Sequence, residues 1–407
     1  MDAIRVLADD LTGACDVGAE LLPWPGGVGV RSCPETARAE GRAAALWVRN
    51  TQSRTLAPAE AARRVTAALA DVGPGWAGLV LKKVDTGLRG QLGAELDAAM
   101  DLLDIEEAFV LPAIPEMGRT TQQGRQLIGG VPVHLTPFAR DPQNPIRDAN
   151  VAAAIEATSR RRAGVVGLGA VRDGLGRAVD EACASGAQII VCDAETDADL
   201  ERAVRSLLLR RRPLLLAGST GLARALRRVL ATEHGGHPRT GPPSPGLGVL
   251  VVAGSAHPAT RAQIERAAAR GFLAPLEVAG GEVAEVIGLE AGSILGAGGT
   301  VALLAPQDVT PGRSGAVLTA LRRAALAALS RTRPSGLVLI GGETAYQVLE
   351  GLGHPPLQVE ARLCPLVVRA RLRSGAYGGL VVVTKGGSTG SDTLLGAIVR
   401  QLGRGAR

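Results

Sequence analysis

Short apolar runs alternate with amphipathic stretches along most of the chain. A run of about four to eight apolar residues predicts a buried strand, and apolar residues that recur every three or four positions predict a helix. In the first half, strands are predicted at residues 4–8, 28–31, 46–48, 78–84, 108–111, 164–168, 188–192 and 214–217. Helices are predicted between them at about residues 16–22, 58–72, 91–103, 174–184, 200–209 and 222–230. This alternation is typical of parallel sheets covered by helices.

The alternation stops at residues 234–248, which contain four prolines and five glycines and show no apolar periodicity. Such a stretch predicts a linker rather than part of a core. Beyond it, strands are predicted at residues 249–253, 301–304, 337–340 and 380–384, with helices near 260–270 and 393–402. We therefore predict an α/β protein of two domains, each with a mostly parallel sheet flanked by helices. The predicted domains are residues 1–234 and 248–407, joined by a linker at residues 235–247.

The composition of the 407-residue chain argues against two classes of partner. The net charge is +6, but the basic residues do not cluster, and three Trp, three Phe and two Tyr residues cannot form a base-stacking surface, so nucleic-acid binding is not expected. Residues 1–11 carry four charged side chains, and no run of about 18 apolar residues occurs, so neither a secretory signal nor a membrane span is expected. We expect a cytoplasmic protein that binds small molecules, and the sequence leaves open whether it forms a homo-oligomer.

Lysine is rare in this chain. Of the 45 basic residues only Lys82, Lys83 and Lys385 are lysines. Where arginine occupies almost every basic position, a retained lysine indicates a place that needs a compact point charge. The alternative is that each of these lysines has been retained by chance and has no special role.

Open α/β sheets bind ligands beyond the carboxyl ends of their strands, and four motifs lie at such positions. The first is ADDLTGA at residues 8–14, where Asp9 and Asp10 follow the first predicted strand. Thr12 and Gly13 open a helix whose backbone amides can hold an anion, and the glycine turn favours a ligand-binding role for the two carboxylates. The alternative is that an Asp here only caps the helix.

The second motif is KKVDTGLRG at residues 82–90, in which two lysines, an acid and an arginine follow a buried strand. This cluster is typical of a site for an anionic substrate. Because side chains alternate along a strand, Lys82 and Lys83 should face opposite ways, so only one of them is expected to reach the crevice. The alternative is an internal ion pair that fixes the loop, although burying charges for structure alone gains little stability.

The third motif is PAIPEMGRTTQQG at residues 112–124, followed by residues 134–146. Together they predict a long irregular stretch, and long loops in compact domains are often functional. Arg119 offers a hydrogen-bonding fork for a carboxylate or hydroxyls. Asp141 is a second candidate to point inward, whereas His134 is expected to be a structural histidine.

The fourth group lies beyond the linker and consists of AGSAHPAT at 253–260, IGGETA at 340–345 and TKGGSTGSD at 384–392. Each follows an apolar strand, so three small-residue turns should meet at one sheet edge. Glycines let the backbone approach phosphates, and the helix after each turn presents free amides to negative charge. The cluster predicts a nucleotide-binding site. Neither a Walker A sequence nor a dinucleotide fingerprint after a first strand occurs, so those two classes are disfavoured.

At these motifs the chain resembles the four-carbon acid sugar kinase family, whose members phosphorylate threonate, erythronate or 3-oxo-tetronate with ATP. The resemblance covers nearly the whole chain, and seven motifs occur in the family's order. They are ADDLTGA, KKVDTGLRG, PAIPEMGRTTQQG, FARDP from Phe138, GSTGLA from Gly218, AGSAHPAT and IGGETA. The resemblance implies an N-terminal sugar-acid-binding domain and a C-terminal nucleotide-binding domain that are divided at the predicted linker.

We therefore predict a kinase that transfers the γ-phosphoryl group of ATP to a hydroxyl of a four-carbon sugar acid, with Mg²⁺ bridging the phosphates. The resemblance implies ATP contacts at Ser255, Gly341, Gly342, Glu343, Thr344 and Gly387, to which we add Gly386. The predicted substrate-binding residues are Lys82 or Lys83, Arg89, Gly90 and Arg119. One of Asp9, Asp10 and Asp85 is predicted to activate the acceptor hydroxyl, and no metal ligand is assigned.

Two other functions are weighed against the kinase. An NAD-dependent dehydrogenase of small hydroxy acids would bind its cofactor at the C-terminal turns, but the fingerprint that it needs is missing. A sugar-acid sensor would bind the ligand without turnover. Release of ADP with a panel of four-carbon acids would separate the three.

The chain departs from the family at two places. Many members resemble KxDSTLRGN, whereas this chain has Thr86, Gly87 and Gln91, so the loop that faces the substrate has lost a hydroxyl. Ser388 and Thr389 stand where the family commonly has an aromatic residue. The first departure leaves the identity of the acid open, and the second bears on the packing against adenine or against the neighbouring domain.

Overall fold

The structure is a computed structural model that describes residues 4–22, 24, 26–32, 46–73, 75–141, 143–230, 241, 244–255, 257–280, 283–307 and 314–403. Most of the predicted linker at 235–247 therefore lies outside the described residues. The chain forms two compact units. The first contains Met1–Gly26 and Cys33–Gly236, and the second contains Gly27–Ser32 and His237–Arg407.

The first unit is built on a parallel sheet with the strand order β3-β1-β4-β11-β5-β10-β9. The strands are β1 (Ile4–Ala8), β3 (Leu46–Asn50), β4 (Leu79–Lys83), β5 (Ala108–Leu111), β9 (Ala163–Val166), β10 (Ile189–Cys192) and β11 (Leu214–Gly218). The central strands are fully buried, which explains why they read as continuous apolar runs in the sequence. Parallel pairing brings the carboxyl ends of β3, β1 and β4 to one edge.

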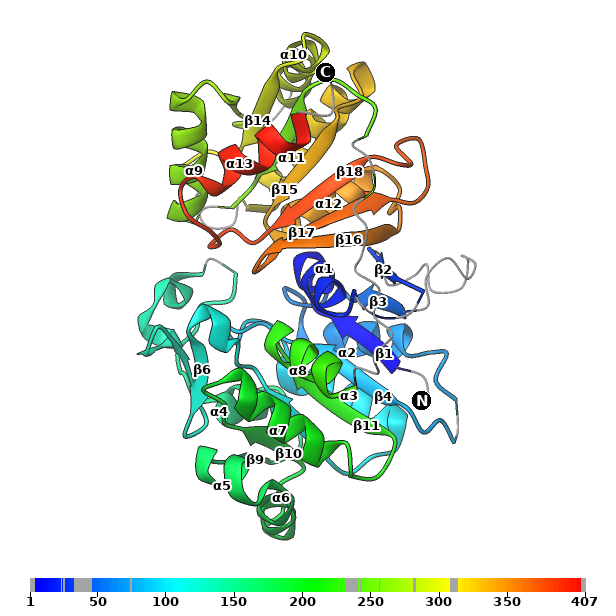
Figure 1. The fold of residues 1–407 in the computed structure, drawn as a ribbon, viewed down its shortest axis with the longest axis vertical. Helices are drawn as coiled ribbons and strands as arrows, with labels where there is room; N and C mark the ends of the chain where they lie inside the picture. Colours follow the sequence, from blue (N-terminus) through cyan, green and yellow to red (C-terminus); the bar gives the residue numbers. More distant parts are fainter. Residues whose placement is uncertain are drawn as a thin grey trace. The chain divides into compact units, whose positions relative to one another are not determined.

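Helices flank the sheet of each unit (Figure 1). Those of the first unit are α1 (Leu11–Glu20), α2 (Pro58–Ala68), α3 (Leu92–Leu103), α4 (Val151–Glu156), α5 (Leu168–Asp173), α6 (Leu175–Ala184), α7 (Asp197–Leu207) and α8 (Thr220–Leu230). One core cluster joins the strands to α2, α3 and α4 through buried residues such as Val65, Leu96 and Ile155. On α1 every residue is buried.

Helix α1 begins at Leu11, five residues before the start that periodicity predicts. The side chain of Asp10 explains the earlier start, because its Oδ1 accepts a hydrogen bond of 2.9 Å from the backbone N–H of Gly13. An aspartate at this position satisfies one of the free amides of the first helical turn. The helix therefore starts directly at the end of β1.

The stretch after β5 is more regular than the sequence predicts. It contains a three-stranded antiparallel sheet of β6 (Arg119–Gln122), β7 (Arg125–Ile128) and β8 (Val131–Pro132), with single turns of 3-10 helix at η2 (Pro115–Met117), η3 (Val133–Leu135) and η4 (Pro137–Arg140). Two tight turns make this sheet, one at Gln123 and Gly124 and one at Gly129 and Gly130, and all four residues have positive φ angles. Such two-residue turns match the twist of paired strands. The prediction of an irregular loop was wrong for residues 119–132.

The second unit has a sheet with the order β13-β14-β12-β15-β18-β17-β16-β2. Its strands are β2 (Val28–Arg31), β12 (Val249–Ala253), β13 (Ala274–Glu277), β14 (Thr300–Leu304), β15 (Gly336–Ile340), β16 (Leu357–Cys364), β17 (Val367–Leu372) and β18 (Val381–Lys385). The first five strands in this order, β13, β14, β12, β15 and β18, pair in parallel. The remaining strands, β17, β16 and β2, are added to the sheet by antiparallel pairing. Both units thus have the mostly parallel, helix-flanked sheets that the sequence predicts.

The helices of the second unit are α9 (Pro258–Ala269), α10 (Val283–Gly296), α11 (Ser314–Arg331), α12 (Gly342–Gly351) and α13 (Leu394–Gly403). Helices α9 and α13 pack together and share a core cluster with β12, β15 and β18. Helices α10, α11 and α12 form a second packed group. None of the described helices is both long enough and apolar enough to cross a membrane.

Strand β2 belongs to the second unit, although the sequence-based boundary placed its residues in the first domain. It pairs antiparallel with β16, with Val30 opposite Leu357 and Gly29 opposite Gln358. The Gln358 side chain also donates a hydrogen bond of 3.0 Å to the carbonyl of Val28. Local periodicity gives no information on which sheet a strand joins, because pairing partners are set by tertiary structure.

Candidate active site

The candidate acceptor site lies at the carboxyl ends of β3, β1 and β4. The backbone amides of Ser53 and Arg54, which follow β3, donate hydrogen bonds of 3.0 and 3.2 Å to the carbonyl of Asp9, which follows β1. The loop after β3 is therefore fixed against the end of β1. This arrangement places three loops from neighbouring strands at one edge of the sheet.

Arg54 is the centre of the charged cluster, and sequence reasoning did not identify it. Its guanidinium binds both carboxylate oxygens of Asp9, at 2.8 and 2.9 Å, and one oxygen of Asp10 at 2.8 Å. Burial by itself raises the pKa of Asp9, but the positive charges of Arg54, Lys82 and Lys83 outweigh it and hold the pKa below its ordinary value. A signal was present in the polar run NTQSR, residues 50–54, directly after an apolar strand.

Asp10 has a structural role that the sequence left as an alternative. Besides the amide of Gly13, its carboxylate accepts a hydrogen bond of 2.6 Å from the hydroxyl of Thr12. With Arg54 as a third donor, both oxygens of Asp10 are engaged. The residue caps α1 and also holds Arg54.

Lys82 and Lys83 lie on opposite faces of β4. Lys82 is completely buried and pairs with Glu95 of α3 at 3.0 Å. The pKa of Glu95 is raised above its ordinary value, mainly by burial. The charge of Lys82 lowers this pKa and the charge of Asp9 raises it. The hydroxyl of Ser53 donates a hydrogen bond to the same carboxylate. Lys83 faces α1 instead: its ammonium lies 3.3 Å from where a Cβ of Gly13 would stand, and it donates to the carbonyl of Val84 at 2.8 Å.

The loop after β4 carries a second arginine–aspartate pair. Arg89 binds Asp85 through two hydrogen bonds, of 2.7 and 3.3 Å, and Asp141 through one of 2.9 Å. Burial raises the pKa of Asp85, but Arg89 and Arg54 together hold it well below its usual range. Gly90 has a φ of +101°, and a Cβ there would stand 3.5 Å from Oδ2 of Asp9, so this loop lies close to the first one.

Arg119 begins β6 and is buried, whereas Arg54 and Arg89 are half-buried. It donates a hydrogen bond to the hydroxyl of Thr86. Burial lowers the pKa of Arg119 below its ordinary value; the charge of Asp85 raises it, and the charge of Arg89 lowers it again. Within the described part of the chain, Arg119 forms no ion pair with a carboxylate.

The cations of the site differ in whether they form ion pairs. Lys83 and Arg119 are buried cations that form no ion pair among the residues described, whereas the other cations each have a carboxylate partner. A buried charge without a partner is costly, so this arrangement favours an anion as the ligand. The paired cations are Arg54 with Asp9 and Asp10, Lys82 with Glu95, and Arg89 with Asp85 and Asp141.

The candidate nucleotide site lies in the second unit at the ends of β12, β15 and β18, which are neighbours in the sheet. A Cβ on Gly387 would stand 2.0 Å from the Oγ of Ser255 and 2.9 Å from its Cβ. A Cβ on Gly254 would stand 2.4 Å from the Oγ1 of Thr344. The three small-residue turns are therefore in direct contact, and glycine is required where they meet.

Helix α12 begins inside this cluster. Gly341 precedes it with a φ of +103°, and no side chain caps the helix. The backbone amide of Gly341 donates to the carbonyl of Lys385 at 2.9 Å, which joins the ends of β15 and β18. Free amides at a helix start attract phosphate groups, so Gly342, Glu343 and Thr344 are placed where a polyphosphate can bind.

Lys385 ends β18 beside Gly386, which belongs to the same set of turns. Its side chain is completely buried, and its ammonium donates a hydrogen bond of 2.9 Å to the carbonyl of Gly386. Burial lowers the pKa of Lys385 to about 8. All three lysines of the chain therefore lie at the carboxyl ends of β4 and β18, where the two candidate sites are.

We expect Lys385→Met to stabilise the protein by about 1 to 3 kcal/mol at pH 7. The unfolded chain holds a proton on this lysine up to about pH 10.4, whereas the folded chain releases it near pH 8. The parental protein should therefore gain stability as the pH rises through this window, and the variant should not. Melting temperatures of both proteins at pH 7 and pH 10 measure this, and a difference between them that does not shrink with pH would contradict the prediction.

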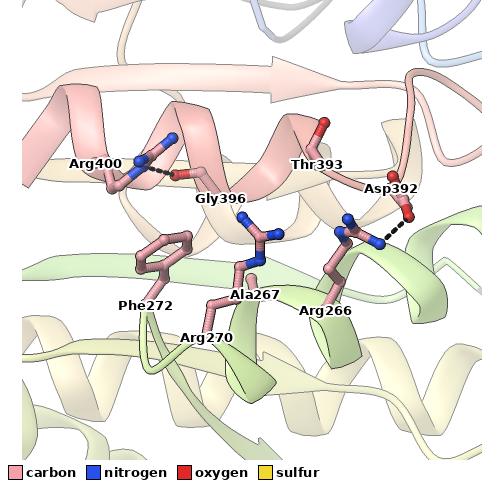
Figure 2. A pocket seen from close by; sticks show the side chains of 8 residues that line it. All are labelled: Arg266, Ala267, Arg270, Phe272, Asp392, Thr393, Gly396 and Arg400. Carbon is pink, nitrogen blue, oxygen red and sulfur yellow. Dashed lines mark hydrogen bonds and ion pairs between the residues drawn. The ribbon is translucent and has the colours of Figure 1, made fainter.

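A shallow pocket lies elsewhere on the second unit, and Figure 2 shows the residues around it. Arg266 forms an ion pair of 2.7 Å with Asp392, and the guanidinium of Arg400 lies 4.8 Å from the ring centre of Phe272. None of the residues predicted to bind ATP lines this pocket. In the part of the chain that the structure describes, no three His, Cys, Asp or Glu side chains gather as a protein-only metal site requires.

The chain matches two families of known domains. A family described as a sugar-binding N-terminal domain matches residues 4–226, and one described as a nucleotide-binding C-terminal domain matches residues 250–395. A crystal structure from Salmonella typhimurium LT2 that carries the name of a tRNA synthase has the same fold, with a TM-score of 0.80, 21% identity and coverage of 98% of this chain and 99% of that one. At that identity the likeness concerns the fold alone.

Relatives of known activity are similar along almost the full length. A D-threonate kinase of Salmonella typhimurium is 31% identical over 96% of both chains. A D-erythronate kinase of Heliobacterium modesticaldum is 30% identical over 96% of this chain and 95% of that protein. A 3-oxo-tetronate kinase of Methylobacterium radiotolerans is 28% identical over 93% of this chain and 96% of that protein. By its two matched domains and these relatives, the chain belongs to the four-carbon acid sugar kinase family.

Proposed function

We propose that this protein transfers the γ-phosphoryl group of ATP to a hydroxyl of a four-carbon sugar acid. The observation that carries the proposal is the pair of buried cations, Lys83 and Arg119, that lack a carboxylate partner among the residues described. They lie in the unit that matches the sugar-binding family. A small acid offers these two cations a carboxylate, and its hydroxyls offer hydrogen bonds to the polar groups around them.

On the acceptor side, we assign Lys83 and Arg119 to the carboxylate of the sugar acid. Lys82 is assigned a supporting role, because its ammonium is taken up by Glu95. Arg89 and Gly90 shape the same loop. This choice between the two lysines follows from their ion pairs, which the sequence alone does not give.

Asp9 is our candidate for the group that orients the acceptor hydroxyl. Asp10 is engaged as a helix cap, and Asp85 is held by two hydrogen bonds from Arg89. The depressed pKa of Asp9 keeps it ionised at neutral pH. Phosphoryl transfer needs little proton removal before bond breaking, so a weakly basic carboxylate that fixes the hydroxyl and Arg54 suffices.

On the nucleotide side, we assign the phosphates of ATP to the three small-residue turns and to the start of α12. The residues assigned to bind them are Ser255, Gly341, Gly342, Glu343, Thr344, Gly386 and Gly387. The support is the contact between these turns and the uncapped start of α12. A lack of side chains at 341 and 387 lets phosphate oxygens reach the backbone. Preorganised amides supply charge stabilisation without reorganisation during the reaction.

Mg²⁺ is proposed to enter with the nucleotide. In kinase sites this ion takes most of its ligands from phosphates and water and only one or two from carboxylates. Glu343 and Thr344 lie in the first turn of α12, whose amides are proposed to bind the phosphates. Their carboxylate and hydroxyl are therefore our candidates for the protein ligands of the ion. When bound, the ion neutralises the charge on the phosphates.

Neither alternative function gains support. The relatives described above are kinases, and none is a dehydrogenase or a sensor.

The proposal is tested by ADP release from the whole protein with ATP, Mg²⁺ and single four-carbon acids: both stereoisomers of threonate and erythronate, and 3-oxo-tetronate. We expect one or two acids to be turned over far faster than the rest. Lactate and glycerol serve as controls, because the first lacks further hydroxyls and the second lacks the carboxylate. Absence of ADP release with every acid, in a protein that melts cooperatively, would refute the proposed function.

A further inference from the structure

Phe138 lies beside the acceptor site, in the short helical turn η4. Its ring faces two of the site arginines. The guanidinium carbon of Arg89 is 5.0 Å from the ring centre, and that of Arg119 is 6.0 Å from it. Both distances are within the range of favourable cation–π contact.

Gly87 makes room for this ring. A Cβ at residue 87 would stand 2.5 Å from two ring carbons of Phe138 and 2.8 Å from Oδ2 of Asp85. Contacts that short do not occur between real atoms, so any side chain at position 87 would displace either the ring or the carboxylate that binds Arg89. The position of Phe138 therefore depends on the absence of a side chain at residue 87.

The ring also contacts two like charges. The charge of Arg89 disfavours the charged form of Arg119, while the charges of Asp85 and Asp16 favour it. Arg89 is tied by two carboxylates, whereas Arg119 is held by the hydroxyl of Thr86 and by the ring. The hydroxyl binds one terminal nitrogen of Arg119, and the ring packs against the guanidinium as a second contact.

We propose that Phe138 is a positioning residue of the acceptor site, which holds Arg119 in place to bind the carboxylate of the sugar acid, and that Gly87 is the residue that permits it. The inference rests on the proposed function. It concerns binding of the acid and not the transfer step, because the described contacts of Arg119 and the ring are with Thr86 and Arg89, and Asp9 is our candidate for the transfer step.

The test uses the whole protein with the acid that it turns over best. Phe138→Leu should raise the Michaelis constant for the acid by roughly threefold to thirtyfold, while turnover number and the Michaelis constant for ATP stay near parental values. Phe138→Tyr keeps the aromatic face and should restore parental acid binding. If Phe138→Leu only disturbed the fold, turnover would fall and the Michaelis constants for the acid and for ATP would both rise. In that case Phe138→Tyr would not restore acid binding selectively.

Phe272→Leu is the matched control. The guanidinium carbon of Arg400 lies 4.8 Å from the ring centre of Phe272, a distance similar to that between Arg89 and Phe138. Phe272 lines the pocket of Figure 2, which belongs to the second unit. This variant should leave the Michaelis constant for the acid unchanged. An equal rise in both leucine variants would mean that the effect is not specific to Phe138.

Gly87→Ala supplies a second, independent test. In the parental background it should raise the Michaelis constant for the acid, because the new methyl group displaces the ring. In a Phe138→Ala background the same change should have a smaller effect, since the ring is gone, and such non-additivity is expected only of groups in contact. If Phe138→Leu does not fold, Gly87→Ala and Phe138→Tyr decide the question.

Two failures are distinguishable. If the parental protein phosphorylates a four-carbon acid but folded Phe138→Leu binds it with parental affinity in calorimetry, the role of Phe138 is refuted and the proposed function stands. If the parental protein neither binds nor phosphorylates any such acid, the proposed function falls, and the inference falls with it.

Discussion

Asp9→Asn should lower turnover of the sugar acid by about a hundredfold to ten-thousandfold and leave the affinity for ATP near its parental value. The carboxylate accepts two hydrogen bonds from Arg54 and lies among three cations. An amide has one acceptor oxygen, and its NH₂ group opposes the guanidinium, so both the orientation of Arg54 and the negative charge are lost. Initial rates and calorimetric ATP binding measure the two effects.

Asp71→Asn is the control for loss of an arginine–aspartate pair as such. Asp71 binds both terminal nitrogens of Arg49, at 2.6 and 2.8 Å, but its side chain is 43% exposed and lies away from the strand ends that form the site. Turnover of this variant should be parental. If Asp9→Asn also retained parental turnover, the acceptor site would have to lie elsewhere.

Gly387→Ala should weaken ATP binding by about tenfold to a hundredfold, that is by about 1.4 to 2.8 kcal/mol. The new methyl group would stand 2.9 Å from the Cβ of Ser255, which is fixed to the backbone, so the turns after β12 and β18 must move apart. The backbone amides would then no longer match the phosphates. Calorimetry with ATP and a melting curve separate lost binding from lost folding.

Gly315→Ala controls for the chemistry of the substitution. Gly315 lies in α11 of the same unit, and nothing stands within 4 Å of the position of its Cβ. Alanine in a helix is at least as favourable as glycine, so ATP affinity and melting temperature should not fall. Parental ATP affinity in folded Gly387→Ala would contradict the placement of the phosphates.

Several parts of the fold follow directly from the sequence because the physics is local. β5 and β12 are continuous apolar runs that are buried on both faces, and their bounds are those that such runs predict. The start of α1 differs because a single hydrogen bond from Asp10, and not periodicity, decides where the helix begins. The β6–β8 sheet differs because its two turns depend on positive φ angles at four particular residues.

The sequence predicts a region for the site but leaves its residues open. Strand ends indicate Asp9, Asp10 or Asp85 and Lys82 or Lys83, because parallel strands bring their carboxyl ends to one edge. Arg54 was missed because nothing in its own loop indicates that it meets Asp9, 45 positions away in the chain. The different surroundings of Lys82 and Lys83 depend on Glu95, which lies on a helix that the pattern describes only as amphipathic.

Strand β2 gives the second unit an unusual order of assembly. Ser32, at its end, donates a hydrogen bond to the carbonyl of Pro355, which lies 323 positions later in the chain. During synthesis this segment leaves the ribosome long before its partner β16 is made, whereas domains generally fold as units from the N-terminus onward. Cutting the chain at the linker would leave β16 with an open edge, which invites pairing with another molecule. Studies of the nucleotide-binding half should therefore supply residues 27–32 as a separate peptide.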